Sequence, residues 1–168
     1  MDNLNSLLAQ RREKAQSLAD AGVALYGNRF KHPQPIAELL PLGKGLVAEA
    51  HDDSGSVFRV AGRIMSMRKF GKAAFFHLRD SSGDIQVYAR RDLLGEENFN
   101  LFKKWDVGDI AGVSGQLFKT KTGELSLEAS ELHMVTKSLR PLPEKFHGLT
   151  DVETRYRQRY LDMIVNPE

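Results

Sequence analysis

The sequence predicts a mainly β protein: a five-stranded barrel with a helix between its third and fourth strands, preceded by an N-terminal α-helix and followed by a linker and a helix. Three observations support this prediction. The central part of the 168-residue chain alternates between apolar and polar residues, as strands with one buried face do. Glycine-containing turns separate the alternating stretches. Helical spacing of apolar residues occurs at the two ends of the chain and once in its middle.

The N-terminal part, residues 1–56, is expected to form a helical extension and a connector. Residues 4–21 predict an amphipathic helix, because their leucines and alanines recur at helical spacing and Gly22 provides a C-terminal stop. The polar side of this helix is basic, and we interpret it as a solvated surface rather than a nucleic-acid contact. Residues 27–46 are rich in proline and glycine and predict a connector with one short helix at residues 36–40.

The central region, residues 57–137, predicts the barrel itself. Its alternating stretches are expected to form five strands, at residues 58–68, 73–80, 85–89, 110–118 and 125–135. A helix is expected at residues 93–105, between the third and fourth strands. Three strands, a helix and two strands is the plan of the OB-fold, a small barrel that binds oligonucleotides.

Alternation assigns the side chains of the first strand to two faces. Phe58, Val60 and Ile64 are expected on one face of the strand. The opposite face is expected to carry Arg59, Arg63, Met65 and Met67.

An OB-fold binds nucleic acid on the outer face of its second and third strands. Alternation predicts that Phe75 and His77 point outward from the second strand and Gln86 from the third. An outward Phe75 suits stacking on a base, and Gln86 offers both a donor and an acceptor to a base edge. The alternative is that Phe75 covers an apolar spot beneath a loop. His77 is an auxiliary candidate, because its ring can stack on a base and can titrate near neutral pH.

The loops that border this face carry further candidates. The loop after the first strand is expected at residues 68–72, and the loop after the fourth strand at residues 119–124. Their cations are candidate RNA contacts, and they are Arg68, Lys69, Lys72, Lys119 and Lys121. Glu124 would repel phosphates, so we expect it to accept hydrogen bonds from a base. Alternatively, Glu124 pairs only with Lys119 or Lys121.

The composition excludes several classes of function. The chain has no cysteine, so it can form neither disulfides nor thiolate metal sites. Its five histidines have no metal-ligand spacing, and it contains no glycine-rich nucleotide-binding motif. We therefore expect no cofactor and no metal in these residues. No apolar run approaches the ~20 residues of a membrane span, and the N-terminus lacks a signal-peptide core, so a cytoplasmic protein without a membrane partner is the default expectation.

Charge is unevenly distributed along the chain. The net charge is only +2, yet six Lys or Arg residues and no Asp or Glu lie between Ser54 and Arg79. Such a stretch can attract phosphates, although a solvated strand face is the more ordinary explanation.

Residues 138–168 predict a linker followed by a helix. Two prolines stiffen the linker, Thr150 and Glu153 form the pattern of a capping box, and Pro167 ends the helix. An amphipathic helix in this position needs a surface to pack against, so we expect it to lead into a further domain.

Five segments of the sequence resemble the OB domain of class II lysyl-tRNA synthetases and the linker that follows it. They read VAGRIM from Val60, FKKWDVGDI from Phe102, FKTKTGELS from Phe118, LRPLPEKFHGL from Leu139 and RYRQRYLD from Arg155. The matches are long, ungapped and specific, since the aspartyl and asparaginyl enzymes share the fold but not the FKTKTGE loop or the PLPEKFHG linker. The resemblance covers residues 57–168 strongly.

The resemblance implies an N-terminal anticodon-binding domain that binds the anticodon of lysine tRNA. The family's stacking phenylalanine falls on Phe75, its base-reading glutamine on Gln86, its basic residue on Arg68 and its acidic residue on Glu124. The catalytic domain would follow residue 168. That domain uses ATP and Mg²⁺ to ligate lysine to its tRNA through lysyl-adenylate, and it forms most of the homodimer interface. The present residues alone are therefore expected to be catalytically inactive.

Two other interpretations stay open. A generic single-strand-binding OB protein would carry several exposed aromatic residues and a basic groove rather than a glutamate at the binding face. A scaffold domain without nucleic acid would bury Phe75 and leave the basic loop unused. The linker and the helix after it favour the synthetase interpretation.

Overall fold

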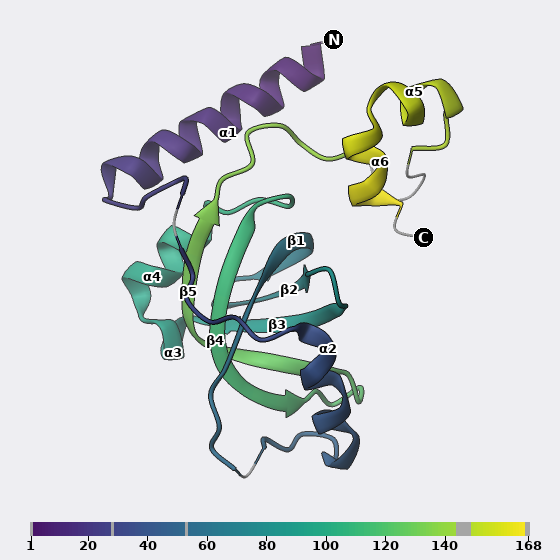
Figure 1. The fold of residues 1–168 in the computed structure, drawn as a ribbon. Helices are drawn as coiled ribbons and strands as arrows, with labels where there is room; N and C mark the ends of the chain where they lie inside the picture. The colour runs from purple at the N-terminus through teal and green to yellow at the C-terminus, as the bar shows by residue number, and fades with distance from the viewer. Residues whose placement is uncertain (1, 28, 53, 144–148, 167–168) are drawn as a thin grey trace.

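The computed structural model describes residues 2–27, 29–52, 54–143 and 149–166. Its strands are β1 (Phe58–Phe70), β2 (Ala73–Arg79), β3 (Asp84–Arg90), β4 (Ile110–Lys119) and β5 (Leu125–Thr136). Its helices are α1 (Asp2–Asp20), α2 (Ile36–Leu39), the 3-10 helix η1 (Leu40–Gly45), α3 (Arg91–Leu94), α4 (Glu96–Phe102), α5 (Val152–Arg157) and α6 (Arg159–Val165). Figure 1 shows the strands wound into a barrel, with α1 and the C-terminal helices at one end and α2 at the other.

The five strands close into a barrel in the order β1-β2-β3-β5-β4. Neighbouring strands are antiparallel except β3 and β5, which run parallel. Val60, Ile64, Phe76, Val87 and Leu127 are almost completely buried inside the barrel, as the alternation of their strands requires. The predicted fold class, a mainly β five-stranded barrel of the OB type with flanking helices, is confirmed.

A β-bulge in β1 changes which residues face outward. Ile64 pairs with Leu78, and the next pair is Ser66 with His77, so Met65 is an extra residue without a partner on β2. An extra residue reverses the alternation beyond it. Met67 therefore packs against the same core as Ile64, and the prediction that these two residues lie on opposite faces is wrong.

The segment between β3 and β4 forms two short helices rather than the single helix expected at residues 93–105. Gly95 separates α3 from α4 and has a φ of 82°, a backbone conformation that glycine adopts at little cost. Phe99 and Phe102 of α4 are buried, and the Phe102 ring lies 5.6 Å from that of Phe76 in the barrel core. The broken helix thus still closes the barrel.

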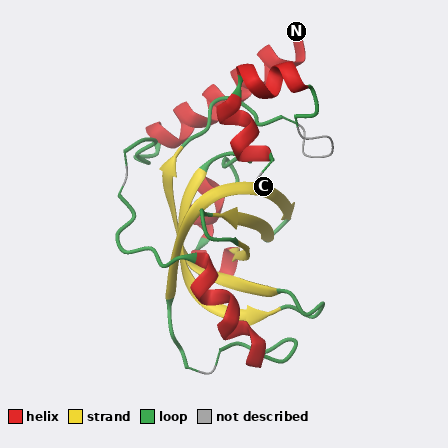
Figure 2. Cartoon of the chain, turned by 45° about the vertical axis from the view of Figure 1, so that its right-hand side comes forward, coloured by secondary structure: helices red, strands yellow, loops and turns green. Residues whose placement is uncertain are grey.

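The N-terminal helix α1 is fastened to the barrel through its basic side. Lys14 forms a 2.6 Å ion pair with Asp106, and Arg11 donates hydrogen bonds to the carbonyl oxygens of Val107 (2.9 Å) and Ser138 (3.1 Å). The interpretation of this side as a merely solvated surface is wrong for these two residues. Figure 2 shows α1 lying across the end of the barrel beside the C-terminal helices.

The C-terminal segment is also more divided than predicted. Asp151, not Thr150, caps α5, because its side chain accepts a hydrogen bond from the backbone N–H of Thr154. Gln158 separates α5 from α6, and the prediction of one continuous helix is wrong. In the part of the chain that the structure describes, none of the helices combines the length and apolar character needed to traverse a lipid bilayer.

Candidate nucleic-acid interface

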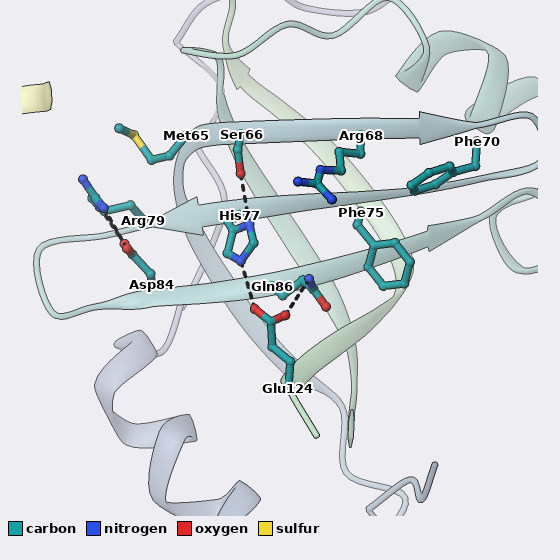
Figure 3. Close-up of a pocket in the computed structure, with 10 residues that line it drawn as sticks. All are labelled: Met65, Ser66, Arg68, Phe70, Phe75, His77, Arg79, Asp84, Gln86 and Glu124. Carbon is teal, nitrogen blue, oxygen red and sulfur yellow. Dashed lines mark hydrogen bonds and ion pairs between the residues drawn. The ribbon is translucent and has the colours of Figure 1, made fainter. Parts of the chain in front are cut away.

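The outer face of β1, β2 and β3 carries a cleft of about 560 Å³. The cleft is lined by Met65, Ser66, Arg68, Phe70, Phe75, His77, Arg79, Asp84, Gln86 and Glu124. Figure 3 shows these side chains converging from the three strands and from the loop after β4. All four residues predicted to form the main site therefore lie together: Arg68, Phe75, Gln86 and Glu124. We call the surface formed by these four residues and His77 the reading face.

Glu124 is the centre of a hydrogen-bonded network on the reading face. Its Oε1 lies 3.0 Å from Nε2 of His77, and its Oε2 accepts a 3.0 Å hydrogen bond from Nε2 of Gln86. Ser66 Oγ lies 3.0 Å from the other ring nitrogen of His77, and Ser126 Oγ donates a 2.7 Å bond to Oε1 of Gln86. The alternative that Glu124 pairs only with Lys119 or Lys121 is wrong.

Phe75 is held in the cleft by other aromatic rings. Its ring stacks on that of Tyr88 with a centroid separation of 4.4 Å and an interplanar angle of 12°. Phe70 meets its edge at 6.3 Å, and Phe118 supports Tyr88 from behind at 5.7 Å. Phe75 itself is half-buried and lines the cleft. It therefore offers an aromatic surface to the cleft and does not lie beneath a loop.

Arg68 lies on β1 and not in a loop. It pairs with Phe75 across the two strands, and only Gly71 and Lys72 form the turn between β1 and β2. The bulge at Met65 is what turns the Arg68 side chain to the outer face, where it is exposed. Among the residues that the structure describes, the side chain of Arg68 has no hydrogen-bonding or ion-pair partner, so its guanidinium is available to a ligand.

Two of the predicted auxiliary cations are engaged inside the protein. Lys69 donates hydrogen bonds to the carbonyl oxygens of Lys103 (2.6 Å) and Trp105 (3.0 Å), and burial lowers the pKa of its ammonium group. Lys119 lies on β4 and donates a 3.0 Å bond to the carbonyl oxygen of Leu46 in the connector. The prediction that both lysines project from the loops toward RNA is wrong.

Half of the six cations between Ser54 and Arg79, Lys69 among them, are committed to contacts within the fold. Arg79 forms two hydrogen bonds to the carboxylate of Asp84, at 2.6 and 2.8 Å. Arg63 donates to the carbonyl oxygen of Gly108 at 2.8 Å. Lys72 and Lys121 are exposed in their loops, and within the described part of the chain their ammonium groups have no partner. The cations left to attract phosphates are therefore few.

Ser66 and Ser126 are site residues that the sequence did not reveal. Ser66 reaches the outer face only because of the bulge. Ser126 is completely buried behind Gln86. A small hydroxyl residue two positions after Glu124 was the only available signal for Ser126, and no comparable signal marked Ser66.

The reading face combines an open aromatic ring, a carboxylate and an oriented amide, which suits recognition of an unpaired base. Within the described residues, no group of three or more histidines, aspartates and glutamates is arranged to hold a metal ion. The ring of Phe75, the carboxylate of Glu124 and the amide of Gln86 offer stacking and hydrogen bonds to a ligand.

Comparison with known proteins agrees with this assignment. Residues 58–135 match the family model described as an OB-fold nucleic acid binding domain, of the tRNA anticodon type. The lysine–tRNA ligase of Streptococcus suis (strain 05ZYH33) is 49% identical over 167 residues, which covers 99% of this chain and 34% of the relative. The ligase of Bacillus subtilis (strain 168) is 46% identical over 99% of this chain, and that of Lactococcus lactis subsp. cremoris (strain MG1363) is 48% identical over 100% of it.

The chain spans about a third of the length of these curated relatives, 34% in each of the three. The matching part is the N-terminal part of the relatives. Both the family model and the relatives therefore point to the same barrel that carries the reading face. Over its whole length the chain is thus similar to the N-terminal part of lysine–tRNA ligases, and its barrel matches the tRNA anticodon type of OB-fold nucleic acid binding domain.

Proposed function

We propose that this chain binds the anticodon of lysine tRNA on the reading face, as the tRNA-anchoring part of a lysine–tRNA ligase. The observation that carries the proposal is the fixed pair of Gln86 and Glu124 beside the ring of Phe75. Gln86 has an N–H directed to Glu124 because Ser126 occupies its carbonyl oxygen. The two side chains thus present a donor and an acceptor side by side.

This pattern is complementary to uracil. Uracil offers an N–H donor at N3 between two carbonyl acceptors, so the Glu124 carboxylate would accept from N3–H while the second N–H of Gln86 donates to a carbonyl oxygen. Cytosine carries an acceptor at N3 and an amine in place of one carbonyl, which reverses the pattern at both positions. A site that is built for one pattern leaves buried polar groups unpaired when it meets the other. We expect the reading face to prefer uridine to cytidine.

Phe75 and Arg68 supply affinity more than discrimination. A base stacked on Phe75 gains roughly 1–3 kcal/mol, and every base has a face that can stack. Arg68 is exposed beside Phe75 on the neighbouring strand, where its guanidinium can contact a base or the phosphate that follows it. Lys72 and Lys121 lie in the bordering loops and would add sequence-independent attraction for phosphates.

The rest of the enzymatic function belongs to the longer relatives. We infer that the complete protein ligates lysine to lysine tRNA with ATP and Mg²⁺, and that it forms a homodimer through the part that these residues do not cover. The described residues hold no metal-binding cluster, and the sequence has no nucleotide-binding motif. Accordingly, residues 1–168 alone should not catalyse lysine-dependent exchange of pyrophosphate into ATP. Exchange above background would contradict this part of the proposal.

The binding proposal is tested with two anticodon stem-loops that differ in one base. One carries three uridines in the anticodon, and the other carries cytidine at the central position. We expect the first to bind more tightly, with a dissociation constant in the micromolar range or weaker, which corresponds to about −8 kcal/mol or less in magnitude. Equal binding of both stem-loops would exclude anticodon reading and would favour a generic single-strand-binding protein. Arg12→Ala, which removes an exposed cation from α1, is the charge control and should not change the preference.

A further inference from the structure

His77 is placed between two polar residues so that both of its ring nitrogens are engaged. Nδ1 lies 3.0 Å from Ser66 Oγ, and Nε2 lies 3.0 Å from Oε1 of Glu124. An ionised carboxylate can only accept hydrogen bonds, so Nε2 must carry the proton that points to Glu124. In the neutral ring Nδ1 then has no hydrogen and accepts one from the Ser66 hydroxyl. The contacts thus select a single neutral tautomer of His77.

The effect of this arrangement falls on Glu124. His77 donates to one carboxylate oxygen and Gln86 donates to the other, at 3.0 Å each. Two donors on two different oxygens fix the rotation of the carboxylate as well as its position. The side chain of Glu124 is 47% exposed and follows directly on the β4–β5 loop, where an unsupported glutamate would sample several rotamers. His77 is therefore one of only two side chains that order this carboxylate among the described residues.

The bulge in β1 is what makes the pairing with Ser66 possible. Ile64 pairs with Leu78, so a regular strand would place Met65 opposite His77. The extra residue places Ser66 there instead. A thioether is only a weak hydrogen-bond acceptor and cannot donate to Nδ1, whereas a hydroxyl can. The bulge thus supplies the group that sets the proton on the far side of the ring.

We propose that His77 is a positioning residue for base recognition: its Nε2–H orients the Glu124 carboxylate toward the base, and the contact of Nδ1 with Ser66 Oγ fixes the imidazole ring. The inference rests on the proposed anticodon function. It adds a specificity-determining pair, Ser66 and His77, that does not itself need to contact RNA. Preorganisation of this kind lowers the entropic cost of binding the correct base, so its loss should reduce discrimination more than affinity.

The test compares substitutions at His77 and Ser66, using the same uridine and central-cytidine stem-loops. His77→Ala should reduce the ratio of the two affinities about tenfold, and it should change binding of the central-cytidine stem-loop less than twofold. His77→Gln keeps a side-chain N–H, so its affinity ratio should lie between those of His77→Ala and the wild-type chain. Ser66→Ala should lower the ratio by a smaller factor. His133→Ala is the matched control, because His133 is an exposed histidine that lines a different cleft, and it should leave the ratio unchanged.

Two results would overturn the inference. The first is a folded His77→Ala variant, judged by its thermal melt, that discriminates as well as the wild-type chain. The second is an imidazole ¹⁵N spectrum of the wild-type chain that places the proton of neutral His77 on Nδ1. If His77→Ala does not fold, the ¹⁵N spectrum and the affinity ratio measured for Ser66→Ala test the inference instead. Failure of the proposed function looks different, since the wild-type chain would then bind both stem-loops equally.

Discussion

Phe75 and its neighbour Phe76 illustrate how one step along a strand changes what a side chain does. Phe76 is 1% exposed and lies in the core, whereas Phe75 lines the cleft and is supported by Tyr88. The same side chain therefore serves stability at one position and is available to a ligand at the next. This contrast provides an internal control for the stacking proposal.

Phe75→Ala should weaken binding of the uridine stem-loop by roughly 1–3 kcal/mol through the loss of stacking. Its cost in folding stability should be limited to the lost contact with Tyr88, about 0.5–1.5 kcal/mol. Phe76→Ala should instead cost about 3–5 kcal/mol of stability, because it leaves a cavity in the core. Thermal melts and binding titrations of both variants separate the two effects. A Phe75→Ala variant that unfolds readily but binds normally when folded would show that Phe75 is a structural residue.

Glu124→Gln should erode the preference for uridine over cytidine more than it reduces total binding. The new amide replaces one carboxylate oxygen with a donor, which would face the N–H of either His77 or Gln86. One of these donors then loses its acceptor, and N3–H of the base loses a charged acceptor. Titrations with both stem-loops measure the change. If the variant binds every RNA more tightly by the same factor, Glu124 is only a loop charge that repels phosphates.

At this scale, what the sequence could reveal depended on the regularity of the strands. Alternation placed Phe75, His77 and Gln86 correctly because β2 and β3 have no register shift between them. It failed for Met67 and missed Ser66 because nothing in the sequence marks the bulge in β1. Lys69 and Lys119 were assigned to loops because a strand that continues to the edge of a hairpin cannot be distinguished from a loop by composition.

The attachment of α1 to the barrel depends on a small group of buried charges. Lys137 is fully buried and contacts Asp109 at 2.9 Å and Asp106 at 2.9 Å, while Lys14 of α1 reaches the other oxygen of Asp106 at 2.6 Å. Burial alone would raise the pKa of Asp106, but hydrogen bonds from Lys14 and Lys137 outweigh it and lower the pKa below its ordinary value. Asp106 thus links the helix to the end of the barrel.

This arrangement predicts a loss of stability in acid. Because the folded state lowers the pKa of Asp106, the contribution is fully present above the unfolded pKa of about 4 and is lost as the pH falls through the lower, folded value. Asp106→Asn should cost about 1–3 kcal/mol at neutral pH, since it leaves Lys14 without a counter-charge and removes one of the two carboxylates that contact Lys137. It should also flatten the acid limb of a plot of unfolding free energy against pH. Asp20→Asn, at an exposed position on α1, is the control. An acid limb that is unchanged in Asp106→Asn would contradict the linkage.

At the level of elements, the sequence located all five strands but not the breaks within helices. Predicted strand ends agree with the observed ends to within two residues, because the apolar–polar alternation stops where a strand stops. The breaks at Gly95 and Gln158 were missed. An interior glycine is compatible with a helix at a cost of only ~1 kcal/mol, and Gln158 is a good helix former, so tertiary contacts decide where these helices end.

For the whole molecule, net charge gives little information about the RNA-binding surface. Three of the cations bond to groups within the fold. Arg63 donates to the carbonyl oxygen of Gly108 and Lys69 to that of Trp105, and Arg79 donates to the carboxylate of Asp84. A run of six cations in the sequence therefore does not become a strongly basic groove. Recognition must rest on the few cations that remain accessible and on the neutral and acidic groups of the reading face. A generic single-strand-binding groove would instead be rich in accessible cations.

The dependence of binding on salt tests this view of the whole surface. Each phosphate neutralised on a single strand contributes a slope of about −0.7 to the logarithm of affinity against the logarithm of salt concentration. Lys72→Ala or Lys121→Ala should flatten the slope by less than one unit, and each should weaken the uridine and cytidine stem-loops by the same factor. Lys69→Ala should leave the slope unchanged and lower the melting temperature instead, because Lys69 bonds to the carbonyl oxygens of Lys103 and Trp105. If Lys69→Ala flattens the slope as much as Lys72→Ala does, Lys69 leaves its internal partners when RNA binds. In that case the cationic surface would be larger in the complex than in the free protein.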